Sequence, residues 1–188
     1  MKRLVLAAAL AVTFALPAAA QETYTVDARH TFPVFEVSHF GMSKQRGMFS
    51  KVTGKIMIDR AGKKGSADIT IDMAALAVGE PKLGDHLRNE DFFDVAKHPT
   101  ATFKSSNFKF DGDKLVSVAG DLTLRGITKP VTLTVEAFNC GSHPMNKKAM
   151  CGAEATTTIK RTDFGIKYAV PAVSDDVKLM IPIEAFKD

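Results

Sequence analysis

Tryptophan is absent from this sequence of 188 residues, which also contains only two tyrosines and two cysteines. Barrels of the outer membrane carry aromatic girdles at both lipid interfaces, so the shortage of Trp and Tyr argues against that class. No run of five or six Lys or Arg occurs and the formal net charge is only +4, so no nucleic-acid partner is expected. Beyond residue 20, no stretch approaches the length of apolar sequence that a helical membrane span needs.

The sequence motifs of common enzymes are also missing. No G-x-S-x-G, H-E-x-x-H, P-loop or paired C-x-x-C is present. The five histidines, at positions 30, 39, 86, 98 and 143, have no spacing that would place them on one metal-binding face. His86 with Asp91 or Asp94 could be drawn as a base and its orienting acid, but no nucleophile with a motif of its own lies nearby. The sequence therefore predicts a protein that is not an enzyme, holds no metal and requires no cofactor.

The first twenty residues have the three parts of a secretory signal. A short positive start precedes an apolar run from Leu4 to Leu16 and small residues up to Ala20. No cysteine follows at the position that a lipid anchor requires. We therefore expect residues 1–20 to be a cleaved signal peptide and residues 21–188 to form one exported domain, in a bacterial periplasm or secreted beyond it.

The two cysteines suit a disulfide bond. Cys140 and Cys151 form an even pair in a chain that is expected to be exported. The segment between them is rich in turn-forming residues, so the bond would hold the mouth of a hairpin and contribute roughly 2–3 kcal/mol. The alternative is a metal site with His143 as third ligand, although the spacing differs from that of the usual zinc pairs.

Apolar and polar residues alternate along most of the remaining chain. Ile69, Ile71 and Met73, for example, alternate with Thr70 and Asp72. Such a pattern is typical of antiparallel strands with one face toward water. About eight such segments, separated by turn signals such as the D-G-D at 111–113, predict an all-β fold.

This all-β fold could be a closed barrel or a sandwich, and two details favour the barrel. Phe49 and Val52 are out of phase on what should be one strand, which predicts a bulge near residues 50–51. Gly54 and Gly120 are suited to the bends that long strands make at barrel corners.

The alternation stops in the stretch H-L-R-N-E-D-F-F-D-V-A-K-H-P-T-A-T-F, residues 86–103. Leu83 and Leu87 are four residues apart, and Phe92 and Phe93 follow on the same apolar side. This spacing predicts a short amphipathic helix that ends before His98-Pro99, because the residue before a proline disfavours helical geometry. We expect the helix to form a lid with its aromatic end toward the interior.

Four stretches together resemble the YceI-like, polyisoprenoid-binding family. Besides residues 86–103, these are D-A-R-H-T-F-P-V-F-E-V-S-H-F-G-M-S (27–43), G-D-L-T-L-R-G-I-T-K-P-V (120–131) and R-T-D-F-G-I (161–166). They agree in order and spacing, and they cover essentially all of residues 21–188. The resemblance implies an eight-stranded antiparallel lipocalin-like barrel with a helix at one end. It also implies an elongated apolar tunnel, a periplasmic location and a homodimer.

From this resemblance we expect a carrier or sequestering protein for a polyisoprenoid or an isoprenoid-quinone-type lipid, with transient membrane association. A binder of fatty acids or fatty amides would use the same tunnel. An alternative from another class is a ligand-free interaction module that docks onto a membrane redox partner.

The predicted tunnel lining consists of apolar residues in the inward phase and of residues from the lid. They are Phe35, Val37, Val52, Ile56, Ile71, Leu87, Phe92, Phe93, Phe103, Val118, Leu122, Leu133, Ile159, Leu179 and Ile181. The pattern alone equally fits a solid core made of the same residues, and it is the family resemblance that favours a tunnel.

Two polar residues, His39 and Arg161, lie in the apolar phase. A buried guanidinium needs a partner. That partner is either a carboxylate, with Asp91 or Asp163 as candidates, or the head group of a ligand at the tunnel mouth. His39 has the same two interpretations. Asp27 and His30 are expected only to form a turn tied by side chains to the backbone.

Overall fold

The computed structural model describes residues 21–188, and the predicted signal peptide lies outside them. Eleven strands occur in this range, with one α-helix and two short 3-10 helices. In chain order they are β1 (Glu22–Val26), β2 (Val34–His39), β3 (Ser43–Phe49), β4 (Val52–Asp59), β5 (Lys64–Asp72), η1 (Met73–Ala75), β6 (Leu76–Ala77), α1 (Pro81–Arg88), β7 (Thr100–Asp111), β8 (Lys114–Leu124), β9 (Ile127–Ser142), β10 (Ala149–Lys160), η2 (Arg161–Phe164) and β11 (Val173–Lys187).

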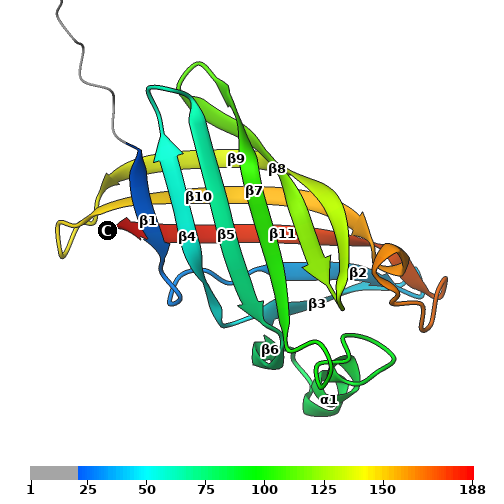
Figure 1. The fold of residues 1–188 in the computed structure, drawn as a ribbon. Helices are drawn as coiled ribbons and strands as arrows, with labels where there is room; N and C mark the ends of the chain where they lie inside the picture. Colours follow the sequence, from blue (N-terminus) through cyan, green and yellow to red (C-terminus); the bar gives the residue numbers. More distant parts are fainter. Residues whose placement is uncertain (1–20) are drawn as a thin grey trace, which may run out of the picture.

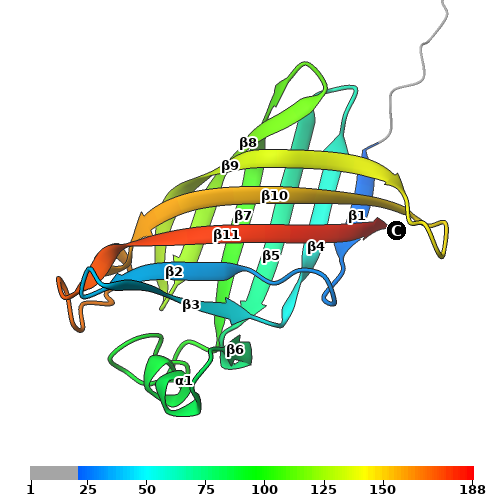
Figure 2. The same cartoon turned by 180° about the vertical axis from the view of Figure 1, so that it is seen from behind.

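The strands close into one barrel (Figures 1 and 2). Each strand pairs antiparallel with its neighbours in the order β1-β4-β5-β7-β8-β9-β10-β11, and β1 pairs in turn with β11. The eight-stranded barrel is therefore confirmed and the sandwich is excluded. Within residues 21–188, no helix is long and apolar enough to cross a membrane.

We call each position that a strand occupies around the barrel wall a stave. Two of these staves are each divided between two separate strands. The edge of β11 pairs with β1 at Ala185–Lys187 and with β2 at 173–180. On the next stave, β4 pairs with β1 and β3 pairs with β2. The chain thus crosses from one half of the barrel to the other at residues 27–33 and again at residues 50–51.

The predicted bulge at residues 50–51 is wrong, because these residues form the second of those breaks. Ser50 N donates to Ala75 O at 3.0 Å, and Asp72 N donates to Lys51 O at 3.0 Å. The chain therefore leaves the ladder with β6 and joins the ladder with β5 within two residues. The break explains why Phe49 and Val52, which are out of phase along the sequence, are both buried.

Glycines permit the sharp bends that were predicted from the sequence. Gly54 has a φ of 152°, and a Cβ there would lie 2.3 Å from Asp68 O. A Cβ on Gly120 would lie 2.4 Å from Lys104 O, beside the β7–β8 register shift. Gly112 adopts a φ of 58° in the tight turn between β7 and β8. Only a residue without a side chain fits the close backbone approaches at Gly54 and Gly120, whereas at Gly112 it is the positive φ that favours glycine.

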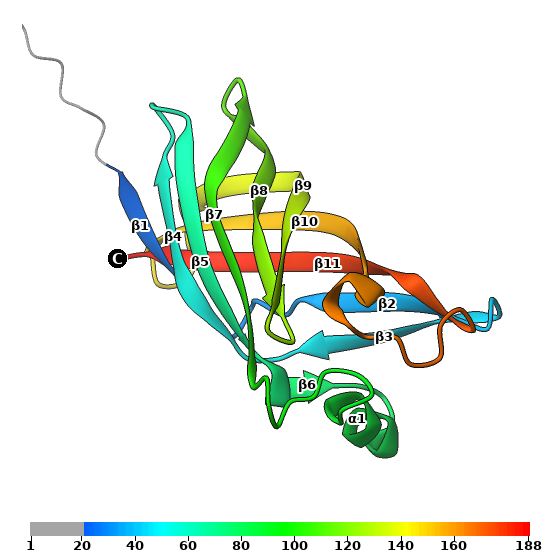
Figure 3. The ribbon, with the colours of Figure 1, turned by 45° about the vertical axis from the view of Figure 1, so that its right-hand side comes forward.

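The helix is shorter than predicted. Pro81 occupies its first turn, and the Glu80 carboxylate caps it by accepting from Leu83 N at 2.6 Å. The helix ends at Arg88, so that Phe92 and Phe93 lie in the turns that follow. Asn89 causes this early end: its side chain accepts from Asp91 N at 2.9 Å and its carbonyl accepts from Asp94 N at 2.7 Å, which replaces helical hydrogen bonding. Figure 3 shows α1 beneath one end of the barrel.

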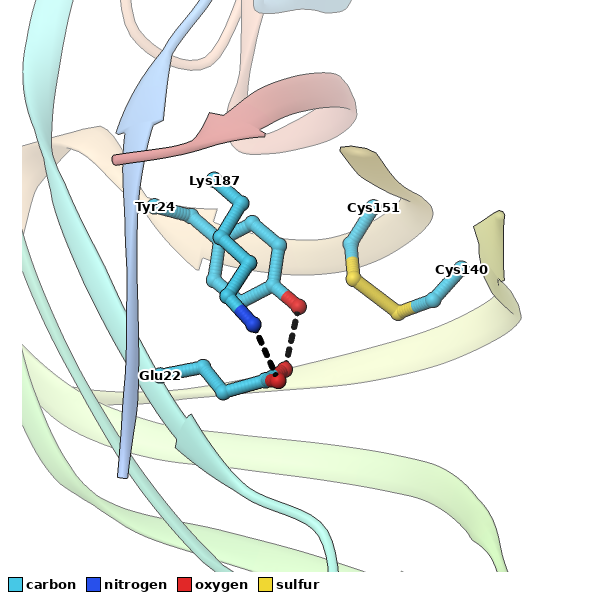
Figure 4. The surroundings of a disulfide bond; sticks show 5 residues. All are labelled: Glu22, Tyr24, Cys140, Cys151 and Lys187. Carbon is cyan, nitrogen blue, oxygen red and sulfur yellow. Dashed lines mark hydrogen bonds and ion pairs between the residues drawn. A yellow bond between two sulfur atoms is a disulfide. The ribbon is translucent and has the colours of Figure 1, made fainter. Parts of the chain in front are cut away.

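The disulfide bond is confirmed at the opposite end. Cys140 and Cys151 face each other across the β9–β10 ladder, with their Cα atoms 4.1 Å apart (Figure 4). The alternative metal site with His143 is excluded, since both sulfur atoms are in the bond.

Candidate functional site: a tunnel through the barrel

The barrel interior is hollow. It holds a cavity of about 760 Å³ whose walls are almost entirely aliphatic and aromatic. Ligand pockets in proteins commonly measure about 300–1,000 Å³. A solid core of interlocked side chains, which the sequence pattern allowed, is therefore not what the chain forms.

All of the apolar residues predicted to line the tunnel lie in the cavity wall. They come from β2, β4, β5, β7, β8, β9, β10 and β11, and from α1 and the turns after it. The alternation phase found them, because side chains of one phase share one face of a strand.

Sequence reasoning missed one class of lining residue, the small ones. Ala67, Ala101, Ala153, Ala155 and Ala185 also face the cavity. Their side chains end close to the backbone, so the space that larger residues would fill stays open. Alanine in the inward phase of several neighbouring strands was the available signal for a hollow interior.

One end of the cavity, which we call the packed end, is filled by side chains. Tyr24, Ile58, Cys151 and Ala185 form a buried cluster there. The Tyr24 hydroxyl donates to Glu22 at 2.6 Å, and Lys187 Nζ donates to the same carboxylate at 2.6 Å (Figure 4). Burial, together with the hydrogen bond to Glu22, raises the pKa of Tyr24 to about 12.

At the other end, which we call the lid end, an aromatic cluster joins the lid to the barrel. The ring of Phe93 lies 5.9 Å from that of Phe35 and 5.7 Å from that of Phe49, both in edge-to-face contact. Leu87 of α1 packs against the same group. The predicted orientation of the aromatic segment toward the interior is thus what the structure shows.

A second set of aromatic contacts lies at the rim of the lid end. His86, Phe92 and Tyr168 contact one another edge to face, with ring centroids 5.0, 5.2 and 5.3 Å apart. Tyr168 belongs to the β10–β11 loop, so these contacts tie the lid to a separate segment. We call the contacts among these three rings the latch. His86 Nε2 also lies 3.4 Å from a carboxylate oxygen of Asp91.

Arg161 is buried at the lid end, where its guanidinium binds backbone carbonyls. Nε donates to Ser174 O at 2.9 Å, and Nη2 donates to Val173 O at 2.9 Å. Nη1 donates to Tyr168 O at 2.8 Å and to Ile166 O at 3.3 Å. Burial lowers the pKa of Arg161 from its ordinary value. The side chain therefore organises the whole loop between β10 and β11.

The predicted ion pair of Arg161 with Asp91 or Asp163 is wrong. Within residues 21–188, no carboxylate oxygen lies within ion-pair distance of the guanidinium. The nearby acid, Asp175, instead accepts from the backbone N and the hydroxyl of Thr162. Carbonyl dipoles take the place of the expected countercharge.

His39 lies in the same part of the wall as Arg161. It pairs with Val173 across the β2–β11 ladder, and its ring centroid is 4.0 Å from that of Phe40. The two polar residues singled out from the sequence therefore both reach the cavity, beside the same residue of β11.

Asp27 and His30 form the turn that the sequence predicted. Asp27 accepts from Arg29 N at 3.0 Å and lies 2.7 Å from His30 Nδ1. Glu184 lies close by, so that ligand atoms of the three side chains are near enough to one another to surround a metal ion. The hydrogen bonds of the turn account for the arrangement, so we assign no chemistry to it.

A closed eight-stranded antiparallel barrel around an apolar cavity, with a lid at one end, defines a lipocalin-like protein. Residues 24–185 match the model of the YceI-like domain. The chain belongs to this family.

Two relatives illustrate the similarity in sequence. Protein YceI of Escherichia coli O157:H7 is 37% identical over 176 residues, which cover 91% of this chain and 90% of that protein. A UPF0312 protein of Ectopseudomonas mendocina is 35% identical over 167 residues, which cover 87% of each chain.

Solved structures share the fold. The crystal structure of BcnA from Burkholderia cenocepacia matches with a TM-score of 0.73 at 25% identity, covering 85% of this chain and 99% of that one. A polyisoprenoid binding domain from Saccharophagus degradans, implicated in plant cell wall breakdown, matches with a TM-score of 0.66 at 18% identity. That match covers 88% of this chain and 98% of the domain, and it concerns the fold alone. None of the four proteins described here bears the name of an enzyme.

Proposed function

We propose that this protein binds a lipid with a long apolar tail, of the polyisoprenoid or isoprenoid-quinone type, inside the barrel. The observation that carries the proposal is the apolar cavity of about 760 Å³, which extends from the lid end to the packed end. The class of ligand is suggested by the polyisoprenoid binding domain that shares the fold. The signal-like residues 1–20 support a periplasmic or secreted location for its carriage or sequestration.

Burial of the tail would provide the affinity. An isoprenoid chain has no polar atoms, so each square ångström removed from water contributes about 25 cal/mol. Burying about 500 Å² of such a chain would contribute roughly 12 kcal/mol. That leaves enough for micromolar binding after the loss of translational and rotational freedom.

The polar end of the ligand would lie at the lid end. His39 reaches the cavity there, whereas the packed end is closed by the buried Tyr24 cluster. Arg161 is less suited to clamp a head group, because four of its N–H groups already bind carbonyls. It would act through its positive charge and by holding the loop in place.

Native mass spectrometry of the protein purified from its host, followed by organic extraction, identifies the ligand class. A bound mass series spaced by isoprene units is the expected result. A series spaced by pairs of methylene groups would instead identify a fatty-acid or fatty-amide binder, which the same apolar walls would accept. Protein that carries no lipid and takes up none in a titration with a fluorescent isoprenoid would favour the ligand-free interaction module.

A matched pair of variants tests the tunnel itself. Ala155 is buried in the cavity wall, whereas Ala137 is exposed on the neighbouring strand β9. Ala155→Phe should weaken isoprenoid binding about tenfold or more, because the added ring would occupy part of the tunnel and the packed walls cannot move apart to restore that space. Ala137→Phe should leave binding unchanged. Equal affinity for both variants, with the circular dichroism spectrum of the barrel intact, would contradict a ligand in this tunnel.

A further inference from the structure

Two loops project side by side at the lid end, beyond the rim of the barrel. One is the tip of the β2–β3 hairpin, residues 40–42, and the other is the segment 167–172 between η2 and β11 (Figures 1 and 3). Phe40 N donates to Ala172 O at 2.8 Å, so the two loops are joined by a backbone hydrogen bond. We call these two loops the paired tips.

The paired tips expose large apolar side chains. Phe40 is 59% exposed, Met42 is 90% exposed and Tyr168 is 48% exposed. Isolated apolar residues on a surface are ordinary, but three on two loops that are hydrogen-bonded to each other mark a contact surface.

The backbone holds Phe40 in this exposed position at a cost. Phe40 has a φ of 55° and Gly41 a φ of 69°, and Met42 N donates to His39 O at 3.0 Å, which closes a tight turn. The first central position of such a turn favours Asn, Asp or Gly, and a bulky side chain is rarely found there. A residue that is unfavourable both for its backbone and for its exposure is explained if its ring is buried against a partner.

The charge of the surrounding segments identifies that partner. Residues 39–46 and 164–174 contain Lys44, Arg46 and Lys167 but no acidic residue. Glu36 accepts hydrogen bonds from Lys44 and Arg46. The next acids along the chain, Asp163, Asp175 and Asp176, lie in η2 and β11 rather than in the tips, and Lys160 pairs with Asp175 and Asp176, so the tips themselves keep the positive charge of Lys167. A second copy of the chain would bring like charges together on this face. An anionic lipid surface matches both the apolar side chains and the bases around them.

The same surface continues into the tunnel. Phe40 and Tyr168 each line the cavity as well as the outer rim, next to His39. A lipid that left a bilayer at this point could therefore pass along apolar side chains without its tail entering water.

We propose that the paired tips dock the lid end of the barrel onto an anionic membrane surface, from which the tunnel is loaded. The loading role rests on the proposed function, whereas the docking itself can be measured without any ligand. The tips insert Phe40, Met42 and Tyr168 among the lipid head groups, and Lys167 is attracted by the net negative charge of anionic lipids.

Vesicle flotation of residues 21–188 tests the docking. Vesicles are made of phosphatidylcholine alone, or with phosphatidylglycerol at a ratio of about three to one. The variant Phe40→Asn/Met42→Ser removes the apolar side chains and places at position 40 a residue that the turn favours. It should reduce partitioning into the anionic vesicles about tenfold. Lys167→Gln should reduce it roughly fivefold, and only when phosphatidylglycerol is present.

Met145→Ser provides the matched control. Met145 is 87% exposed in the β9–β10 hairpin at the packed end, so it is comparable with Met42 in exposure and differs in position. Partitioning of this variant should equal that of the unaltered protein. The proposal is overturned if the unaltered protein does not float, if Met145→Ser weakens flotation as much as the double variant does, or if sedimentation reveals a dimer that the double variant abolishes.

A second measurement separates docking from ligand binding. Dansyl-labelled geranylgeraniol is presented either from ethanol or from anionic vesicles. Met42→Ser alters a residue of the tips that lies outside the cavity wall, so this variant should bind the probe from ethanol as well as the unaltered protein does, but should acquire it from vesicles about threefold more slowly. If the unaltered protein floats with vesicles yet binds no probe from either source, the proposed lipid-binding function fails and the docking surface stands. If Met42→Ser acquires the probe from vesicles at the unaltered rate, the loading role is overturned.

Discussion

The two ends of the barrel are built differently. At the packed end the two divided staves are formed by the continuous strands β1 and β4. A disulfide bond crosses the β9–β10 hairpin there, and Tyr24 is buried at the end of the cavity. At the lid end these two staves continue as the separate strands β2 and β3, and the short strand β6 pairs with β3. There the barrel is completed by α1, the turns after it and the β10–β11 loop, which touch through aromatic rings.

This difference indicates which end of the barrel opens more readily. Backbone ladders and a covalent bond resist opening at the packed end, whereas edge-to-face ring contacts contribute only about 0.5–1.5 kcal/mol each. Segments with few backbone pairings open most readily. A ligand would therefore exchange through the lid end while the packed end stays closed.

The largest expected loss of stability follows from replacing Arg161. This residue lies at the lid end, although the other contacts of that end are weak. Arg161→Leu leaves four carbonyls without their donor, so we expect the free energy of unfolding to fall by about 4 kcal/mol. Arg161→Lys should not restore it, because an ammonium group cannot reach all four acceptors. Denaturant unfolding measures both.

Arg29→Leu is the control for Arg161. Its side chain is 81% exposed and lies 3.6 Å from Asp27, so this change should cost less than about 1 kcal/mol. If Arg161→Leu costs no more than this control, the β10–β11 loop does not depend on the guanidinium.

Removal of the disulfide bond tests the packed end directly. The double variant Cys140→Ala/Cys151→Ala should lose about 3 kcal/mol of stability, mainly because its unfolded chain is less restricted. The melting temperature should fall by roughly 6–12 °C, as measured by calorimetry. Exchange of a bound probe at the lid end should be unaffected. Faster exchange would mean that the two ends are coupled.

A smaller effect should appear at the packed end in alkali. The pKa of Tyr24 is raised from 10 to about 12 by burial and by Glu22. The folded protein therefore keeps a proton that the unfolded chain loses, and stability falls as pH rises from 10 to 12. This loss amounts to about 2 kcal/mol. Tyr24→Phe should abolish that part of the pH dependence.

Spectrophotometric titration of Tyr168→Phe isolates the remaining tyrosine. Because the chain has two tyrosines, the tyrosinate absorbance of this variant comes from Tyr24 alone. A midpoint near 10 would show that Tyr24 is not held at the packed end in the manner described.

The smallest effect is expected at the latch. Phe92→Leu removes the ring contacts to His86 and Tyr168 and should destabilise the lid by about 1 kcal/mol. Hydrogen exchange should accelerate in residues 81–98 and stay unchanged in β9 and β10. Phe110→Leu, which alters the packed end, is the control and should not affect the lid. Uniform acceleration in both variants would remove the distinction between the ends.

Most of the barrel could be predicted from the sequence. Alternation depends on neighbouring residues alone, so it identified the strands and the inward face that carries Leu122 and Ile181. The even number of cysteines, in a chain expected to be exported, likewise predicted their bond. The broken staves could not be found in this way, because the break at residues 50–51 depends on hydrogen bonds to Ala75 and Asp72, far along the chain.

The lid end was harder to predict for two physical reasons. The helix stopped early because Asn89 formed local hydrogen bonds that compete with helix continuation. The carbonyls that bind Arg161 are brought together only when the β10–β11 loop is folded, and nothing in their side chains marks them. A search for acidic partners therefore found none of them.

The hollow interior also affects how the molecule responds to compression. A barrel that encloses about 760 Å³ occupies more volume than its atoms require, and unfolding releases that excess. Hydrostatic pressure favours the state of smaller volume and so acts against this fold. A lipid tail of the kind proposed would fill part of that space, so the lipid-bound protein should resist pressure better than the lipid-free protein.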